Sequence, residues 1–431
     1  MSLAADSRES GVIAQVQRAL ADSALAASFA PLLYARNGFD EAGAPALAWL
    51  AGNARAALDF ITDKPQGTHK LSIRSAPDAA EARGGTIIEI LNDDMPFLVD
   101  SIMGELQARG LQVRWLLHPI FKTKRDRSGK LLALLGAGDQ NWNDGRQESY
   151  ISIQLPPLPE AQQRDLSKAL SHILTNVRLA VTDWRPMLQE VEFAVRQLET
   201  TRRGVPPSEL REGVAFLRWL EAGNFTFLGT RRYALSASAG EAGEFIAVEK
   251  SGLGVLRDPH VHVLRRGAEL VDMTPEIRRF YAAPAALIVT KASMKSLVHR
   301  RVHMDYVGVK TFGRDGTLAG EIRLVGLFTS QAYVKSPRDI PFLRHKVETV
   351  LKLSGYPEAS HAGKSLINVI ETFPRDELFQ IDADQLHEWS EAIVDLEIRP
   401  RVRVFARVDR FDRFVSALVF VPRDRYTSDV R

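Results

Sequence analysis

The stretch from residue 86 to residue 121 constrains the fold most, because its pattern changes from strand to helix and back to strand. Residues 86–91 form a short β-branched run, which predicts a strand with both faces buried. The next apolar residues recur at helical spacing and make one apolar face: Met95, Leu98, Val99, Ile102 and Leu106. Gly110 can end this helix as a C-cap, and the alternating pattern after it predicts a second strand.

The turn between the first predicted strand and the helix is the candidate ligand site, formed by Asn92, Asp93, Asp94 and Met95. The N–H groups at a helix start can hold a carboxylate, and Asp93 or Asp94 could hold an ammonium group beside it. An amino acid carries both groups, so the turn suits an amino-acid effector. A second interpretation stays open, because asparagine and aspartate at a helix start often serve only as N-caps.

The surrounding pattern predicts an antiparallel sheet covered by helices. Residues 70–75 are typical of a strand, residues 122–147 of a polar hairpin and residues 151–155 of another strand, and an amphipathic helix follows. This order is most of a ferredoxin-like βαββαβ sheet. No strand follows the second helix, so we expect residues 70–75 to supply the missing edge from upstream.

The rest of the chain alternates between β-rich and helical sections. Residues 200–209 are rich in turn formers, and strands are predicted between residues 224 and 334, with a hairpin turn at 313–316. The predicted fold class is α+β. The expected parts are an N-terminal helical segment (1–69), an α+β domain (70–199), a linker helix with a β-rich domain (200–336), a helical segment (337–400) and a β-hairpin (401–431).

Two glycine-containing motifs are similar to parts of nucleotide sites, but neither is complete. Residues 363–365 match the end of a P-loop, whose earlier glycine is replaced by Glu358. The run GLGVLR at 252–257 has Arg257 where the third glycine of a dinucleotide fingerprint belongs, so a hairpin turn is the better interpretation. We therefore predict no catalytic and no cofactor-binding residues in this chain.

Acidic and histidine clusters also lack the pattern of a metal site. The polar residues at 139–145 have Tyr150 where an EF-hand needs its closing glutamate. Several histidines come without a carboxylate pattern, so no metal is predicted at His260, His262, His299 or His303. The arginines after residue 399 alternate with apolar residues and aspartates, which indicates outer strand faces rather than a nucleic-acid surface.

Composition narrows the class of protein further. The chain has no cysteine, which excludes disulfides and thiolate zinc sites. Its formal net charge of +3 is too small to indicate nucleic acid or membrane as a partner. No apolar run approaches the roughly 18 residues of a membrane span, and the N-terminus lacks the order of a signal peptide. We expect a cytoplasmic protein.

Long runs of the sequence resemble the N-terminal regulatory region of the large bacterial NAD-dependent glutamate dehydrogenases. These runs are NDDMPFLVDSI (92–102), WLEAGNFTFLGTRRY (219–233), HRRVHMDYVGVKTFG (299–313) and LVFVPRDRYTSDVR (418–431). The resemblance implies an ACT-like domain at 70–199, a PAS-like domain at 200–336, and the start of a second ACT-like unit at 401–431. In ACT domains, which sense amino acids, the corresponding strand–helix turn binds the ligand, usually at an interface.

By this resemblance, the parent enzyme deaminates L-glutamate oxidatively to 2-oxoglutarate and ammonia, with NAD as its cofactor. The chain itself would hold no cofactor, and its partners would be further copies of itself, the catalytic region of the parent and an amino-acid effector. We expect a regulatory fragment, because the terminal hairpin stops where a helix should begin. The alternative is a free-standing amino-acid sensor or scaffold, whereas a self-contained hydrolase or dehydrogenase is disfavoured by the missing motifs.

Overall fold

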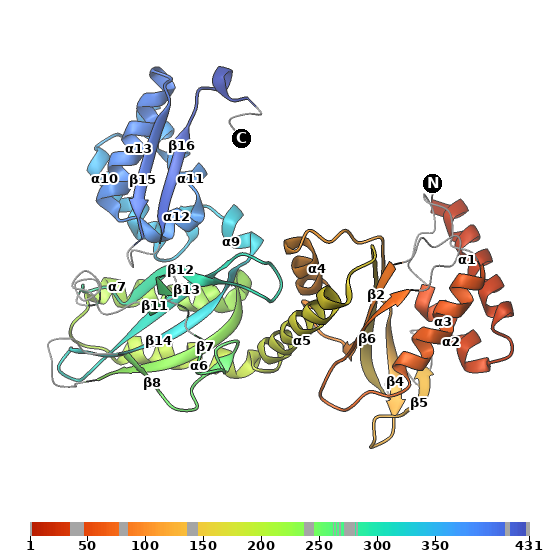
Figure 1. The fold of residues 1–431 in the computed structure, drawn as a ribbon. Helices are drawn as coiled ribbons and strands as arrows, with labels where there is room; N and C mark the ends of the chain where they lie inside the picture. Colours follow the sequence, from red (N-terminus) through yellow and green to blue (C-terminus); the bar gives the residue numbers. More distant parts are fainter. Residues whose placement is uncertain are drawn as a thin grey trace. The chain divides into compact units, whose positions relative to one another are not determined.

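The computed structural model describes residues 2–34, 47–76, 85–135, 145–236, 245–261, 263, 265–266, 269–270, 281, 283–409 and 414–427. The chain divides into two compact units (Figure 1). The first unit contains Met1–Arg178 with Leu297–Arg301, and the second contains Leu179–Ser296 with Val302–Arg431.

The first unit begins with a group of helices that share one apolar core. They are α1 (Ser2–Ala19), α2 (Ala24–Tyr34) and α3 (Leu47–Ile61). Tyr34 is fully buried between them, and its hydroxyl donates a hydrogen bond of 2.8 Å to the carbonyl of Leu50. All three helices lie within the helical segment predicted at residues 1–69, and α2 forms although it contains Pro31 in its interior.

An antiparallel sheet follows, with the strand order β1-β2-β6-β4-β5 and with β3 also pairing with β6. Its strands are β1 (Lys70–Ala76), β2 (Gly85–Asp93), β3 (Trp115–Leu117), β4 (Ile120–Arg125), β5 (Leu131–Leu135) and β6 (Arg146–Leu155). Strand β1 pairs with β2 from Lys70 opposite Leu91 to Ala76 opposite Gly85. The prediction that residues 70–75 supply the edge of the sheet is therefore confirmed.

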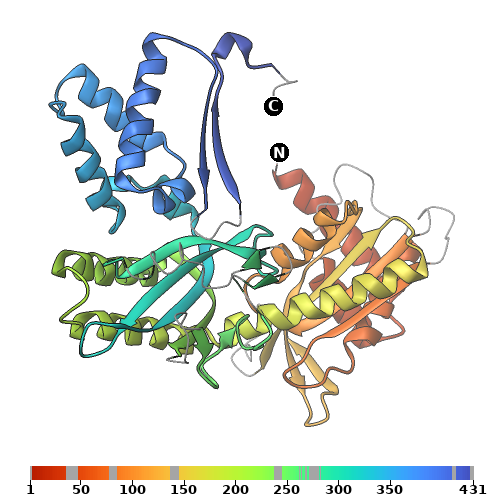
Figure 2. The same cartoon turned by 60° about the vertical axis from the view of Figure 1, so that its left-hand side comes forward.

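Helices cover both faces of this sheet. Helices α1–α3 lie on one face, and α4 (Leu98–Ala108) and α5 (Glu160–Thr182) lie on the other (Figure 2). Strand β2 between them is buried along nearly its whole length, as its β-branched composition predicts. Leu98, Ile102 and Leu106 are at most 2% exposed, which confirms the predicted apolar face of α4. The unit is an α+β fold with a ferredoxin-like sheet.

The second unit contains another antiparallel sheet, with the order β12-β13-β14-β7-β8 and with β9 pairing with β7. Its strands are β7 (Phe225–Leu235), β8 (Phe245–Ala247), β9 (Leu253–Gly254), β12 (Leu287–Lys295), β13 (His303–Phe312) and β14 (Leu318–Phe328). A separate short pair joins β10 (Arg265–Arg266) and β11 (Glu269–Leu270). The predicted turn at 313–316 connects β13 to β14, and Gly316 there has a φ of 87°. The predicted β-rich section is confirmed, and its PAS-like character stays a prediction.

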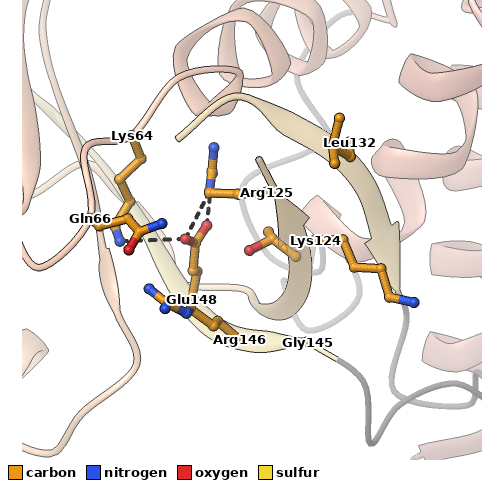
Figure 3. Close-up of a pocket in the computed structure, with 9 residues that line it drawn as sticks. Lys64, Gln66, Lys124, Arg125, Leu132, Gly145, Arg146 and Glu148 are labelled. Atoms are coloured by element: carbon orange, nitrogen blue, oxygen red, sulfur yellow. Dashed lines mark hydrogen bonds and ion pairs between the residues drawn. The ribbon is translucent and has the colours of Figure 1, made fainter. Parts of the chain in front are cut away.

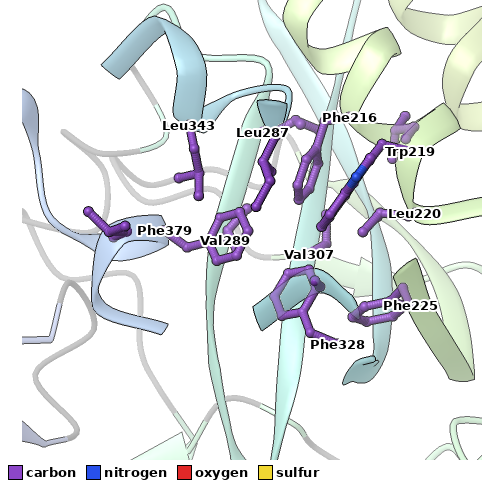
Figure 4. Packing of buried hydrophobic residues seen from close by; sticks show 14 of the residues in the cluster. Phe216, Trp219, Leu220, Phe225, Leu287, Val289, Val307, Phe328, Leu343 and Phe379 are labelled. Carbon is purple, nitrogen blue, oxygen red and sulfur yellow. The ribbon is translucent and has the colours of Figure 1, made fainter. Parts of the chain in front are cut away.

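Helices α6 (Trp184–Thr200) and α7 (Pro207–Trp219) precede this sheet, and the π-helical turn η1 (Leu220–Asn224) leads into β7. Aromatic side chains from these helices and from the strands share one core with the helices that follow the sheet (Figure 4). Within that core Phe328 stacks on Phe379, with ring centroids 4.6 Å apart. The core therefore joins residues far apart in the sequence within the second unit.

The remaining helices and the terminal hairpin complete the second unit. They are α9 (Ser330–Val334), η2 (Pro337–Asp339), α10 (Leu343–Ser354), α11 (His361–Thr372), α12 (Arg375–Gln380), α13 (Ala383–Ile398), β15 (Arg403–Val408), β16 (Val415–Phe420) and η3 (Arg423–Arg425). The predicted hairpin is confirmed. Phe405 on one of its faces packs on Trp389 of α13, with ring centroids 5.3 Å apart, whereas the valines of its other face are exposed.

Candidate functional site

The candidate turn lies where strand β2 ends against β6. The strand register places Asn92 opposite Ser149 and Asp93 opposite Glu148. Asn92 is fully buried, and Asp93 is partly buried. The ladder therefore holds the first half of the turn as the end of a sheet strand rather than as an open loop.

Two cations hold the carboxylate of Asp93. The Lys64 ammonium lies 2.6 Å from one oxygen, and the Arg178 guanidinium of α5 lies 2.7 Å from the other. Burial by itself would raise the pKa of Asp93, but the hydrogen bonds from Lys64 and Arg178 outweigh it and lower this pKa below its ordinary value. Asp93 is therefore a charged residue whose partners come from outside the turn.

The neighbours of Asp93 are also hydrogen-bonded. Asn92 accepts a hydrogen bond from Arg178 through its side-chain oxygen. Asp94 accepts a hydrogen bond of 2.8 Å from the hydroxyl of Ser149, and the Nε2 atom of His118 lies 3.0 Å from the same hydroxyl. Burial lowers the pKa of His118, and nearby Asp94 partly opposes this shift. The residues of the turn are thus part of a network of polar side chains at this end of the sheet.

The start of helix α4 differs from the prediction. The helix begins at Leu98 rather than near Met95, and Phe97 before it has a φ of 74°, a left-handed conformation that bulky residues rarely adopt. No side chain caps α4. The interpretation of residues 92–94 as N-caps is therefore wrong, because their polar groups pair with distant side chains instead. A ligand-binding role for the turn stays a prediction.

A second charged cluster adjoins the first through Lys64. The Lys64 ammonium lies 3.4 Å from Oε1 of Glu148, which is fully buried on β6. Arg125 of β4 donates to both oxygens of the same carboxylate, over 2.9 and 2.8 Å. Its guanidinium also donates to the carbonyls of Ile61, Thr62 and Gly129. Arg125 therefore ties the end of α3 to the sheet, and all three charges lie in one buried group.

A cavity of about 540 Å³ opens beside this cluster (Figure 3). Its charged wall consists of Lys64, Lys124, Arg125, Arg146 and Glu148. In Figure 3 Glu148 lies between Lys64 and Arg125, and Arg146 lies next to it. The sequence pattern does not predict this cavity, because it places Lys124, Arg125 and Arg146 in a polar hairpin and Lys64 in a separate helical segment. The one local signal is Glu148, a carboxylate that directly precedes the buried strand residues 149–153.

Comparisons with known proteins assign the chain to a family. It matches family models for three parts of glutamate dehydrogenase: the ACT1 domain at residues 29–170, helical motif 1 at 340–399 and the ACT2 domain at 403–431. It is 35% identical over 348 residues to the NAD-specific glutamate dehydrogenase of Halomonas elongata, a match that covers 80% of this chain and 21% of that protein. The chain belongs to the family of the NAD-specific glutamate dehydrogenases.

Two further glutamate dehydrogenases of this family show similar coverage. The NAD-specific enzyme of Pseudomonas aeruginosa is 36% identical over 349 residues, covering 80% of this chain and 21% of that protein. The one from Mycobacterium tuberculosis is 28% identical over 349 residues, covering 80% and 20%. The chain thus spans about a fifth of the length of these relatives. The predicted resemblance of this chain to the N-terminal region of such glutamate dehydrogenases is confirmed.

The family matches place the candidate site in the ACT1 domain. The ACT1 match contains both the turn at 92–95 and the whole charged wall of the cavity. The ACT2 match begins at the first residue of strand β15, as expected for the start of a second ACT-like unit. The β-rich section between residues 224 and 334 lies outside these family matches.

The other motifs occupy structural positions. Residues 363–365 lie in the first turn of α11, where the hydroxyl of Ser360 caps the N–H of Gly363 at 3.0 Å. Asp183 accepts hydrogen bonds from the N–H of Gly254 at 2.8 Å and from Arg257, which holds the 252–257 turn. The described residues contain no cluster of three or more histidine, aspartate or glutamate side chains suited to a metal. His262 and residues 139–144 lie outside the described residues.

Hydropathy adds one further finding. No helix in the described part of the chain combines the length and apolar character that a membrane crossing requires.

Proposed function

We propose that this chain is the regulatory and assembly region of an NAD-specific glutamate dehydrogenase. The observation that supports this most is the similarity over 80% of the chain to relatives of that name. The parent enzyme deaminates L-glutamate oxidatively to 2-oxoglutarate and ammonia in the cytoplasm, with NAD held by its catalytic region. The partners of this chain are that catalytic region and further copies of the same polypeptide.

An amino-acid effector binds at the turn of Asn92, Asp93, Asp94 and Met95. The side chain of Asp93 keeps an exposed fraction of 29% although two cations hold it. The ammonium group of an amino acid can therefore replace Lys64 or Arg178 at this carboxylate, and the released cation can receive the ligand carboxylate. Lys64 follows α3, and Arg178 lies on α5. The exchange changes how both helices are tied to the sheet.

This exchange supplies a physical basis for regulation. A ligand shifts an equilibrium between two arrangements only if it binds one of them better. Because the ligand competes for ion pairs that exist without it, its affinity differs between the paired and the released arrangement. The resulting coupling to catalysis is reciprocal, so substrate also changes the affinity for the effector.

The test is calorimetric titration of the common amino acids into the intact parent enzyme, with glutamate dehydrogenase activity followed in parallel. We expect at least one amino acid to bind and to change the activity. Asp93→Ala should weaken its binding about tenfold, by loss of one charge-assisted contact. Asp94→Asn should weaken it less, because it keeps the size of the side chain.

The control is Asp165→Asn, which removes an exposed carboxylate of α5 that pairs with Arg109 outside the turn. It should leave the affinity unchanged. Full affinity in folded Asp93→Ala and Asp94→Asn variants would show that the effector binds elsewhere. An intact parent without glutamate dehydrogenase activity would instead contradict the broader assignment.

A further inference from the structure

The cavity beside Glu148 has the charge of an anion site, and it lies outside the turn to which the amino-acid effector proposed above binds. Its wall carries the cations Lys64, Lys124, Arg125 and Arg146 against the single carboxylate of Glu148. We propose that this cavity binds a small doubly charged anion that carries carboxylate or phosphate groups. The proposal concerns binding only and does not depend on the catalytic identity of the parent.

The carboxylate of Glu148 does not make the net charge of the cavity wall negative. Both oxygens of Glu148 already accept hydrogen bonds from Arg125, and Lys64 lies 3.4 Å from one of them. Glu148 is fully buried, so it cannot turn outward to meet a cationic ligand. Because Lys64 also pairs with Asp93, the charges of Lys64 and Arg125 are balanced by those of Asp93 and Glu148. The net positive charge of the cavity wall therefore comes from its remaining cations, Arg146 above all, and it favours an anion there.

Arg146 is the side chain best placed to contact the ligand directly. It is exposed at the start of β6, and it forms no ion pair with any residue that the structure describes. A guanidinium can donate two parallel hydrogen bonds to a carboxylate or a phosphate, which makes arginine the preferred side chain for such anions. Figure 3 shows Arg146 beside Glu148, on the same wall as the buried cations.

An unpartnered hydroxyl supplies independent support. Thr123 is 2% exposed, lines the cavity, and pairs with Arg146 in the β4–β6 register. Its Oγ1 atom has no hydrogen-bond partner among the described residues. Buried hydroxyl groups are almost always hydrogen-bonded. An anion held by Arg146 would place oxygen acceptors within the cavity that Thr123 lines.

The size of the cavity and its link to the turn agree with a small regulatory ligand. Its volume of about 540 Å³ lies within the roughly 300–1,000 Å³ of small-molecule sites. Lys64 lies 3.4 Å from Glu148 and 2.6 Å from Asp93, so one ammonium group touches both the cavity wall and the candidate turn. An anion that attracts Lys64 towards the cavity would weaken its pair with Asp93.

The experiment titrates the purified 431-residue chain with malonate, succinate, inorganic phosphate and pyrophosphate at constant ionic strength. Neutral succinamide serves as the uncharged probe. We expect a saturable rise in melting temperature and a calorimetric signal with the dianions but not with succinamide. Stronger binding of malonate and succinate would identify a dicarboxylate site, and stronger binding of the phosphates a phosphate site.

Variants locate the binding. Arg146→Gln should weaken it about tenfold, and Thr123→Val, which keeps the shape of the side chain, about threefold. Arg164→Gln alters an exposed arginine of α5 outside the cavity wall and should leave the affinity unchanged. Asp94→Asn should also leave it unchanged, which separates this site from the amino-acid turn.

Either of two results would overturn the proposal. The first is that no dianion shifts the melting temperature beyond the effect of sodium chloride at the same ionic strength. The second is that Arg146→Gln binds the anion as tightly as the unaltered chain.

Discussion

At the residue scale, Lys64 shows why a cation can be buried in this fold. Its side chain is 3% exposed, and it pairs with Asp93 and Glu148. A buried ammonium without a counter-charge is strongly destabilising, so the two carboxylates are what allow Lys64 to be buried. Arg125 pairs with the other oxygen of the Glu148 carboxylate. Glu148 alone gives a local signal, and the other members of this group could not be predicted from sequence because they lie on separate strands and loops.

Asp305 in the second unit carries a prediction about pH. It is 3% exposed, lies 2.6 Å from the ammonium of Lys291, and accepts a hydrogen bond from the N–H of Phe328. Burial raises the pKa of Asp305 from 3.8 to about 6, Lys291 opposes this shift, and Asp376 adds to it. The folded chain therefore holds this proton more tightly than the unfolded chain does.

The sign of the pH effect follows from this raised pKa. The contribution of Asp305 to the free energy of unfolding is fully present below its unfolded pKa and is lost as the pH rises through about 6. Between pH 4 and pH 7 we expect the unaltered chain to lose up to about 3 kcal/mol relative to Asp305→Asn, which cannot titrate. Denaturant unfolding of both proteins across this range measures the difference. Parallel stability curves would contradict the prediction.

At the element scale, helix α4 depends on its apolar face. Ile102 is fully buried against the sheet. Ile102→Ala should lower the free energy of unfolding by about 2–5 kcal/mol, because it removes buried methyl groups and leaves a cavity. Gln107→Ala on the exposed side of the same helix is the control and should change stability by less than about 0.5 kcal/mol. Equal melting temperatures for the two variants would mean that the face is misassigned.

The same element shows how far the sequence predicts this fold. Hydrophobic spacing correctly predicts β2, the buried face of α4 and the edge strand β1, since each depends on which residues avoid water. The predicted start of α4 is wrong for a different reason. The polar groups at 92–94 suit a cap locally, but Asp93 pairs instead with Lys64 and Arg178, which lie 29 and 85 positions away. Such tertiary contacts override local propensity.

The two candidate sites also differ in how far the sequence alone predicts them. The turn at 92–95 could be proposed from sequence, because its residues are adjacent and suggest a ligand by their own chemistry. The cavity could not be, because its wall joins Lys64 after α3 with residues of β4 and β6. Only the sheet register, which places Thr123 opposite Arg146, brings these groups together.

At the scale of the whole molecule, the terminal hairpin predicts self-association. The outer face of β15 and β16 is apolar and exposed: Val404, Val408, Val415 and Val419 are 56–63% exposed. The register pairs Val404 with Val419 and Val408 with Val415, so these side chains form one continuous surface. Because an exposed apolar sheet face with open edges favours association, we expect the purified chain to form a homodimer or a larger assembly.

Light scattering at several concentrations measures this assembly against the monomer mass of 47.9 kDa. The double variant Val404→Lys and Val419→Lys should shift the chain towards the monomer, because two like charges would then face each other on the apolar surface. Val334→Lys, at a valine of α9 that is 82% exposed, is the matched control and should leave the mass unchanged. A monomer at every concentration of the unaltered chain would contradict the prediction. An assembly that the double variant leaves intact would instead place the interface on another surface, for which the edge strand β1 is the next candidate.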